Sequence, residues 1–153
     1  LGWVAGKREF IDAVLKVKSN MDSGMFLGLQ HAATEALKSG AEWFTALNKV
    51  YAERKQAAEK ILDVLGCTYS TDQSGLFVWA KAPTGIADVE KWIDEILYGT
   101  KVFITPGFIF GEAGRRYIRI SLCCTVEMLQ QALKRIEAFQ QQKVSSTTAT
   151  VAS

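Results

Sequence analysis

The 153-residue sequence lacks the features that mark several common classes of protein. It has no apolar run close to the roughly 20 residues that a membrane-spanning helix needs, so no membrane protein is predicted. Its 18 basic and 16 acidic residues are mixed along the chain, and no basic block indicates binding to nucleic acid or to an anionic membrane. The apolar share of 48% and the charged share of 22% are ordinary for a globular domain.

Cysteine and histidine are scarce as well. The odd number of cysteines (Cys67, Cys123 and Cys124) and the adjacency of two of them argue against a disulfide framework. We therefore expect reduced thiols and a cytoplasmic protein. The single histidine, His31, lies in a predicted helix without a second ligand at metal-site spacing, so we predict a structural role for it. No metal site and no Ser/His/Asp catalytic set is predicted.

The spacing of apolar residues predicts a small sheet covered by helices. Helices are expected over 9–17, 26–37, 41–65, 88–97 and 125–139, and strands over 1–6, 76–80, 102–104 and 117–122. Gly66 is expected to end the longest helix, and Asp88 is expected to cap the next one. The Trp and Phe residues fall at core spacing and are predicted to lie in the core. The fold class is therefore α/β, with a small α+β domain.

The ends of the sequence suggest a cut from a longer chain. Residue 1 is Leu rather than Met, and residues 1–6 resemble a buried strand entered midway. We expect residues 1–40 to be the truncated end of a larger domain and residues 41–139 to form a small C-terminal domain. Residues 140–153 are small and polar, and we expect a flexible tail there.

Arg119 is the candidate binding residue. Side chains alternate between the two faces of a strand, so Tyr117, Arg119 and Ser121 share one face. An arginine on a short rigid strand can present its planar fork to a carboxylate through two hydrogen bonds. The competing interpretation is a solvated arginine on an exposed face. The nearby glycines of 107–114 lack the strand, Lys and Ser/Thr context of a phosphate-binding loop and are interpreted as turn residues.

Three segments of the sequence resemble a known family. Thr105-Pro106-Gly107, Phe110-Gly111, Gly114 and Tyr117–Ser121 resemble the C-terminal signature of the class I/II, fold-type I aminotransferases that depend on pyridoxal 5'-phosphate. Residues 18–33 resemble the branch that contains aspartate, alanine and LL-diaminopimelate aminotransferases, and residues 1–6 resemble the strand after that family's Gly-Trp-Arg motif. The similarity covers about residues 1–139.

The resemblance implies a function for Arg119 and an incomplete site around it. Arg119 matches the family arginine that binds the α-carboxylate of an amino acid or 2-oxo acid substrate. Asn20, Asp22 and Ser23 match a region near the mouth of the site, and no definite role is assigned to them. The lysine that attaches the cofactor and most of its other ligands lie upstream of Leu1 in this family. We therefore expect these 153 residues to contain no catalytic or cofactor-binding residue, to be inactive alone and not to bind pyridoxal 5'-phosphate.

The resemblance further implies that the parent enzyme is a homodimer. Two alternatives stay open on sequence grounds. A lyase of the same fold would use the same carboxylate-binding arginine, because both chemistries act on amino acids. A free-standing α+β module that binds amino acids or a partner protein would use it without any chemistry.

Overall fold

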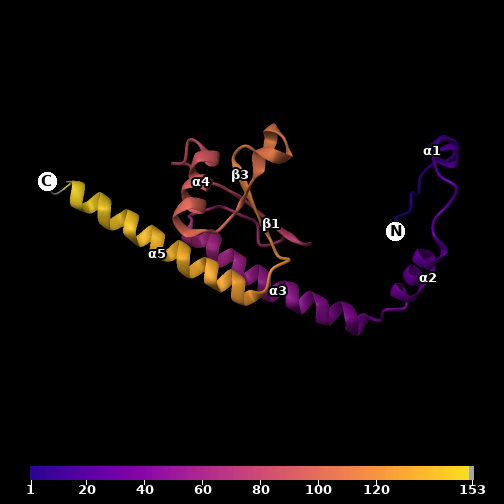
Figure 1. The fold of residues 1–153 in the computed structure, drawn as a ribbon, viewed down its shortest axis with the longest axis horizontal. Helices are drawn as coiled ribbons and strands as arrows, with labels where there is room; N and C mark the ends of the chain where they lie inside the picture. Colours follow the sequence, from indigo (N-terminus) through magenta and orange to yellow (C-terminus); the bar gives the residue numbers. More distant parts are fainter. Residues whose placement is uncertain (152–153) are drawn as a thin grey trace. The chain divides into compact units, whose positions relative to one another are not determined.

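The computed structural model describes residues 1–151 and the side chains of all of these except 144 and 146–151. The chain divides into two compact units, Leu1–Ala46 and Leu47–Ser153 (Figure 1). We call them the N-terminal unit and the C-terminal unit. No helix among residues 1–151 combines the length and the hydropathy that crossing a bilayer requires.

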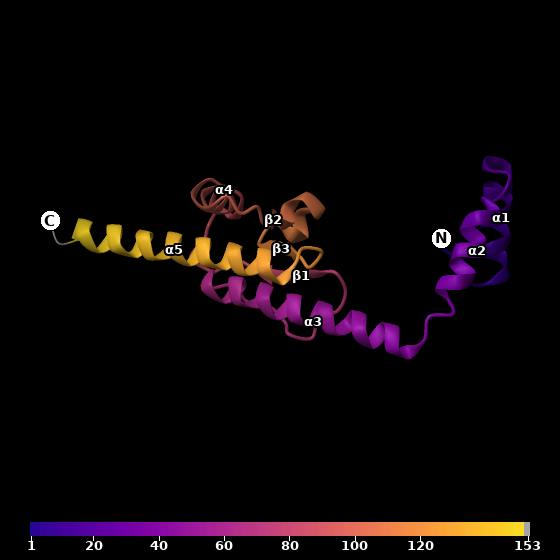
Figure 2. The same cartoon turned by 60° about the horizontal axis from the view of Figure 1, so that its bottom comes forward.

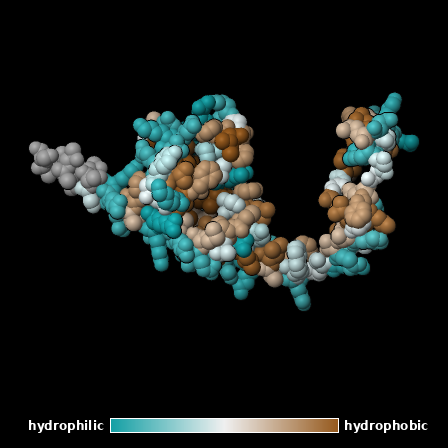
Figure 3. All heavy atoms as spheres, viewed as in Figure 1, coloured by the Kyte–Doolittle hydropathy of each residue, from teal (hydrophilic) through white to brown (hydrophobic). Residues whose placement is uncertain are grey.

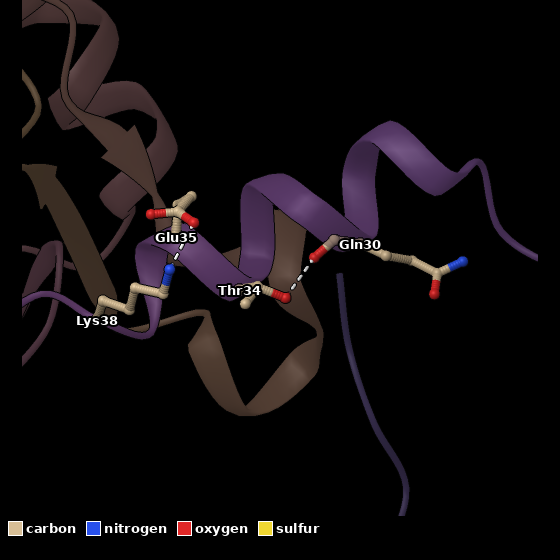
Figure 4. A network of polar contacts seen from close by, with 4 residues as sticks. All are labelled: Gln30, Thr34, Glu35 and Lys38. Carbon is tan, nitrogen blue, oxygen red and sulfur yellow. Dashed lines mark hydrogen bonds and ion pairs between the residues drawn. The ribbon is translucent and has the colours of Figure 1, made fainter.

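The N-terminal unit consists of helices without a core. Helix α1 (Arg8–Met21) and helix α2 (Leu27–Ala36) form where sequence spacing predicts them, but no residue of this unit is buried. Local polar contacts stabilise α2: Thr34 Oγ1 donates to the Gln30 carbonyl (2.9 Å), and Lys38 pairs with Glu35 (2.7 Å; Figure 4). Both contacts join residues three or four positions apart, so they support the helix without packing it against anything.

The strand predicted over residues 1–6 is absent. These residues have no regular secondary structure, and their large apolar side chains are exposed. A strand exists only as part of a hydrogen-bonded ladder, and no described residue of the chain pairs with this segment. The apolar residues of this segment predicted a buried strand, but they carry no information about whether another strand lies beside it.

Helix α3 (Ala41–Val64) matches its predicted span and its predicted end. Gly66 takes a left-handed conformation (φ 69°), and the Cys67 N–H donates to the Leu62 carbonyl (2.9 Å). This pairing, with Gly66 N–H bonded to the Asp63 carbonyl, is a Schellman motif, which glycine favours because it has no Cβ. Of the long apolar stripe, only the second half of the helix is buried, through Ala57, Ala58, Ile61 and Leu62.

The C-terminal unit is built on a three-stranded antiparallel sheet. The strands are β1 (Phe77–Lys81), β2 (Thr105–Pro106) and β3 (Tyr117–Ser121), in the order β1-β3-β2. Alternation along β1 and β3 buries one face completely. That face packs in one apolar core with the second half of α3 and with helices α4 (Val89–Thr100) and α5 (Val126–Val151). Its four core residues are Val78, Ala80, Ile118 and Ile120.

Two helices cover the sheet beside α3. Asp88 caps α4 as predicted, since its side chain accepts from the Lys91 N–H (3.1 Å). Gly99 allows α5 to approach closely, because a Cβ at this position would collide with the ring of Phe139. Figures 1 and 2 both show α3 and α5 side by side. The close pair of long helices and α4 thus pack in one core with the buried face of the sheet.

The predicted boundaries were wrong at two further places in the C-terminal unit. Residues 102–104 are not a strand, because the Val102 N–H donates to Thr100 Oγ1 (3.1 Å) and the ladder with β3 begins only at Thr105. Residues 140–151, expected to be a flexible tail, continue helix α5, and residues 152–153 lie outside the described residues. The Lys143–Glu95 ion pair (2.7 Å) links this extension to α4.

Candidate carboxylate-binding site

The second face of the sheet is not covered by the helices. It carries the side chains that alternate with the core residues, and we call it the open face: Phe77, Trp79, Tyr117, Arg119 and Ser121. In the strand register, Trp79 of β1 and Thr105 of β2 lie opposite Arg119, which occupies the central strand. Arg119 thus stands in the middle of the open face on the strand that has neighbours on both sides.

Two aromatic rings contact the Arg119 guanidinium. Its Cζ atom lies 4.0 Å from the ring centroid of Phe77 and 4.1 Å from that of Phe110. A cation over an aromatic face is attracted by the negative face of the ring. The side chain is half-buried, so these contacts replace part of its hydration. Strand alternation predicted this face for Arg119, but it predicted no contact with the two rings.

Arg119 differs from its two neighbouring arginines in its hydrogen bonds. Arg115 is paired in bidentate fashion with Glu112 (2.6 and 2.8 Å), and this pairing lowers the pKa of the Glu112 carboxyl. Arg116 donates to the backbone carbonyls of Pro83 (2.8 Å) and Ile86. Among the described residues, Arg119 has no acidic partner and no hydrogen-bond acceptor. Its N–H groups are therefore available to an external anion.

A cavity of about 470 Å³ lies next to Arg119. It is bounded by residues 101–105, the end of β3 and helix α5. Lys101, Arg119 and Arg135 contribute three positive charges to its lining, whereas no lining residue is acidic. The rest of the lining is mainly apolar, which raises the effective strength of those charges. The cavity therefore suits a small anion with an apolar portion.

The loop before β3 positions Phe110 through two close glycines. It forms two short 3-10 turns, η1 (Gly107–Phe110) and η2 (Glu112–Gly114). A Cβ on Gly107 would lie 2.7 Å from the Tyr117 carbonyl oxygen, and a Cβ on Gly114 would collide with Gly107. The two turns can stack only because both residues lack side chains. The glycines that the sequence placed in a turn are thus needed for this close backbone contact.

The other residues singled out from the sequence make only local contacts or are exposed in this chain. His31 is exposed on α2, and the three cysteines are free thiols. Asn20 donates to the Lys16 carbonyl (2.6 Å), Asp22 pairs with Lys18, and Ser23 is exposed. No group of three or more His, Cys, Asp or Glu side chains in the described part of the chain could hold a metal ion.

Phe77 and Phe110 are the site residues that sequence reasoning missed. Both were taken for core residues, yet Phe77 is 37% exposed and Phe110 is 48% exposed. Strand alternation from the buried Val78 would have placed Phe77 on the face opposite the core. Phe110 lies in the segment that resembles the family signature, but nothing in the sequence predicted its contact with Arg119, because that contact depends on the path of the η1 turn.

Comparison with known proteins now places this geometry in a family. The profile of the family "Aminotransferase class I and II" matches residues 1–136. The chain belongs to this aminotransferase family. The small sheet with its covering helices therefore has the fold of the corresponding part of fold-type I aminotransferases, as the resemblance in the sequence implied.

Individual relatives agree with this assignment. An LL-diaminopimelate aminotransferase from Maridesulfovibrio salexigens is 35% identical over 135 residues, which are 88% of this chain and 34% of the relative. The structure of BacF from Bacillus subtilis is similar with a TM-score of 0.74 and 32% identity, over 87% of this chain and 34% of BacF. A probable N-succinyldiaminopimelate aminotransferase from Thermus thermophilus gives a TM-score of 0.77 and 26% identity, over 88% and 36%. The chain thus spans about a third of the length of the relatives it matches.

Proposed function

We propose that this chain is the C-terminal part of an enzyme that transfers an amino group between an amino acid and a 2-oxo acid. Within it, Arg119 binds the carboxylate of the substrate. The observation that carries the proposal is the half-buried Arg119 guanidinium, which has no acidic partner among the described residues and borders a cavity without acidic lining. Family membership supports the reaction class, and the names of the relatives make LL-diaminopimelate the first amino donor to test.

The contribution of Arg119 to such a reaction is binding and orientation. A guanidinium fork holds a carboxylate by two parallel hydrogen bonds, which set both its position and its plane. Because the strand and the two rings hold the side chain, the bound substrate is oriented before any bond changes. The positive lining from Lys101 and Arg135 adds attraction for an anionic substrate at a distance.

The proposed cofactor is pyridoxal 5'-phosphate, which supplies the electron sink that amino-group transfer needs. The described residues do not fit the task of holding it. Lys101, the only lysine that lines the cavity beside Arg119, is exposed and donates to the Tyr98 carbonyl (3.0 Å). We therefore assign the cofactor's attachment to parts of the whole protein outside this chain, and we derive no step through it.

The domain assignment is part of the same proposal. Residues 1–40 would belong to the large domain of the whole enzyme and residues 41–139 to its small domain. The N-terminal unit supports this, because it exposes apolar side chains on both helices and buries none (Figure 3). Such surface requires a covering partner, which the remaining two thirds of a relative's length would provide. A homodimer, common among soluble enzymes, is proposed for the whole protein.

Substitution of Arg119 in the full-length enzyme tests the proposal. We expect Arg119→Lys and Arg119→Ala to lower kcat/KM for amino acids by roughly 100-fold or more, since an ammonium cannot make the two-pronged contact. Cofactor absorbance should be retained. The matched control is Arg115→Lys, because Arg115 is exposed and already paired with Glu112.

Unchanged kinetics in both Arg119 variants would show that Arg119 does not belong to the substrate site. Release of ammonia in place of amino-group transfer would favour the lyase alternative.

A further inference from the structure

Two phenylalanines from separate segments converge on the guanidinium of Arg119. Phe77 belongs to β1 and Phe110 to η1, and their ring centroids lie at nearly the same distance from Arg119 Cζ, 4.0 and 4.1 Å. These contacts use the faces of the rings, whereas the N–H donors of a guanidinium point outward in its plane. The rings can therefore hold the group without consuming the donors that a carboxylate needs.

The ring of Phe110 is itself held in place. Trp79 contacts Phe110 edge to face, with 5.3 Å between ring centroids. The backbone of Trp79 is bonded on both sides to the Gln73 side chain, through its N–H (2.8 Å) and its carbonyl (2.9 Å). The close approach of Gly107 and Gly114 restricts the turn that carries Phe110. Phe110 thus has packing support of its own, and Phe77 is carried by β1, a strand paired with β3.

Contact with the two rings changes the entropy that the Arg119 side chain loses when a carboxylate binds. A free arginine side chain has several rotatable bonds, and ordering it on binding reduces the net affinity. If the rings already restrict Arg119 in the free protein, most of that ordering cost falls on folding rather than on binding. Affinity for the carboxylate then depends on residues that do not touch it.

We propose that Phe77 and Phe110 are positioning residues that hold the Arg119 guanidinium for carboxylate recognition. This inference rests on the proposed function of Arg119 and extends it to two residues with no hydrogen-bonding side chain. The alternative is that the rings merely shield Arg119 from water and contribute only to stability. The two roles predict different behaviour when Arg119 is absent.

The test is a double-mutant cycle in the full-length enzyme. The variants are Phe110→Leu, Phe110→Tyr, Arg119→Ala and the combination of Phe110→Leu with Arg119→Ala. We expect Phe110→Leu to raise KM for the amino acid by roughly fivefold with a smaller change in kcat, as expected for the loss of one cation–π contact. Phe110→Tyr keeps the ring and should restore KM to within about twofold. In the Arg119→Ala background, Phe110→Leu should have almost no further effect.

The control and the contrary outcomes separate this inference from the function proposed above. Phe139→Leu removes a ring that also contacts a cation, Lys143, but lies on α5, and KM should be unchanged. If Arg119→Ala leaves KM unchanged, the proposed function itself fails. If Arg119→Ala raises KM but Phe110→Leu does not, only the positioning role fails. An equal effect of Phe110→Leu with and without Arg119 also overturns it. If Phe110→Leu does not fold, the same double-mutant cycle is measured with Phe77→Leu. The outcomes that support or overturn the positioning role are then the same.

Discussion

At the scale of single residues, the ability to bind an anion depends on which arginine side chain has no hydrogen-bond or ion-pair partner. Three arginines lie within five positions of one another, yet only Arg119 makes no hydrogen bond or ion pair with a described residue. Arg115 and Arg116 are occupied by a carboxylate and by backbone carbonyls. Residue type and strand alternation predicted the face on which Arg119 lies. They could not predict which arginine would be free, because that depends on acceptors brought from elsewhere by the fold.

The three thiols are expected to differ in reactivity. Burial raises the pKa of Cys67 from 9.0 to about 12, whereas Cys123 is exposed. The thiolate is the reactive form, so iodoacetamide should label Cys123 first and Cys67 only slowly, faster as the pH rises. Labelling rates between about pH 7 and 10, followed by mass spectrometry, measure this difference. Equal rates for the two thiols would contradict the partly buried position of Cys67.

The same pKa shift has a consequence for stability. A raised pKa means that the folded state holds the Cys67 proton more tightly than the unfolded chain does. This contribution is fully present below pH 9 and is lost as the pH rises from about 9 toward 12. Cys67→Ser should weaken the decline of stability over that alkaline range, because a hydroxyl does not ionise there.

At the scale of elements, local signals located the helices, whose hydrogen bonds lie within one segment, although they missed residues 140–151 of α5. The positions of α1 to α4, the glycine that ends α3 and the Asp88 cap follow from spacing and capping chemistry, although α1 ends at Met21 rather than at Val17. The strand predictions for residues 1–6 and 102–104 were wrong for one reason. A strand needs a partner edge, and alternation in one segment says nothing about where the ladder begins.

The cap of α4 gives a test at this scale. We expect Asp88→Ala to destabilise the protein by about 1 kcal/mol, because the Lys91 N–H loses its acceptor. Asp94→Ala is the matched control, since Asp94 is an exposed carboxylate of the same helix without a partner in the described part of the chain. Thermal or urea unfolding measures both. A loss of stability at Asp94 as large as that at Asp88 would show that charge, rather than capping, is responsible.

At the scale of the whole molecule, the two units differ in what they bury. The C-terminal unit has a continuous core of α3, α4, α5 and the sheet, with residues such as Ile118 and Ile136 fully enclosed. The N-terminal unit buries no residue at all, although it too is rich in apolar residues. Its helices satisfy their backbone hydrogen bonds but gain little from packing, which normally supplies most helical stability.

Hydrogen exchange of the 153-residue chain should reveal this difference. Amides of α1 and α2 are expected to exchange close to the rate of an unfolded chain, whereas amides of β3 and α4 should be protected by the core. Exchange followed by mass spectrometry of peptic fragments provides the measurement. Comparable protection in α1 and β3 would mean that the N-terminal unit is stable without a covering partner.

The sequence by itself determined the helices, their caps, the alternation that separates core from open face, and the candidate arginine. These features depend on interactions between residues a few positions apart, which periodicity and capping residues encode directly. Only the tertiary structure decided that Arg119 has no acidic or hydrogen-bonding partner among the described residues, that Phe77 and Phe110 contact it, and that the predicted first strand has no neighbouring strand there. Each of those facts depends on segments distant in the chain meeting in space, and no local pattern specifies such a meeting.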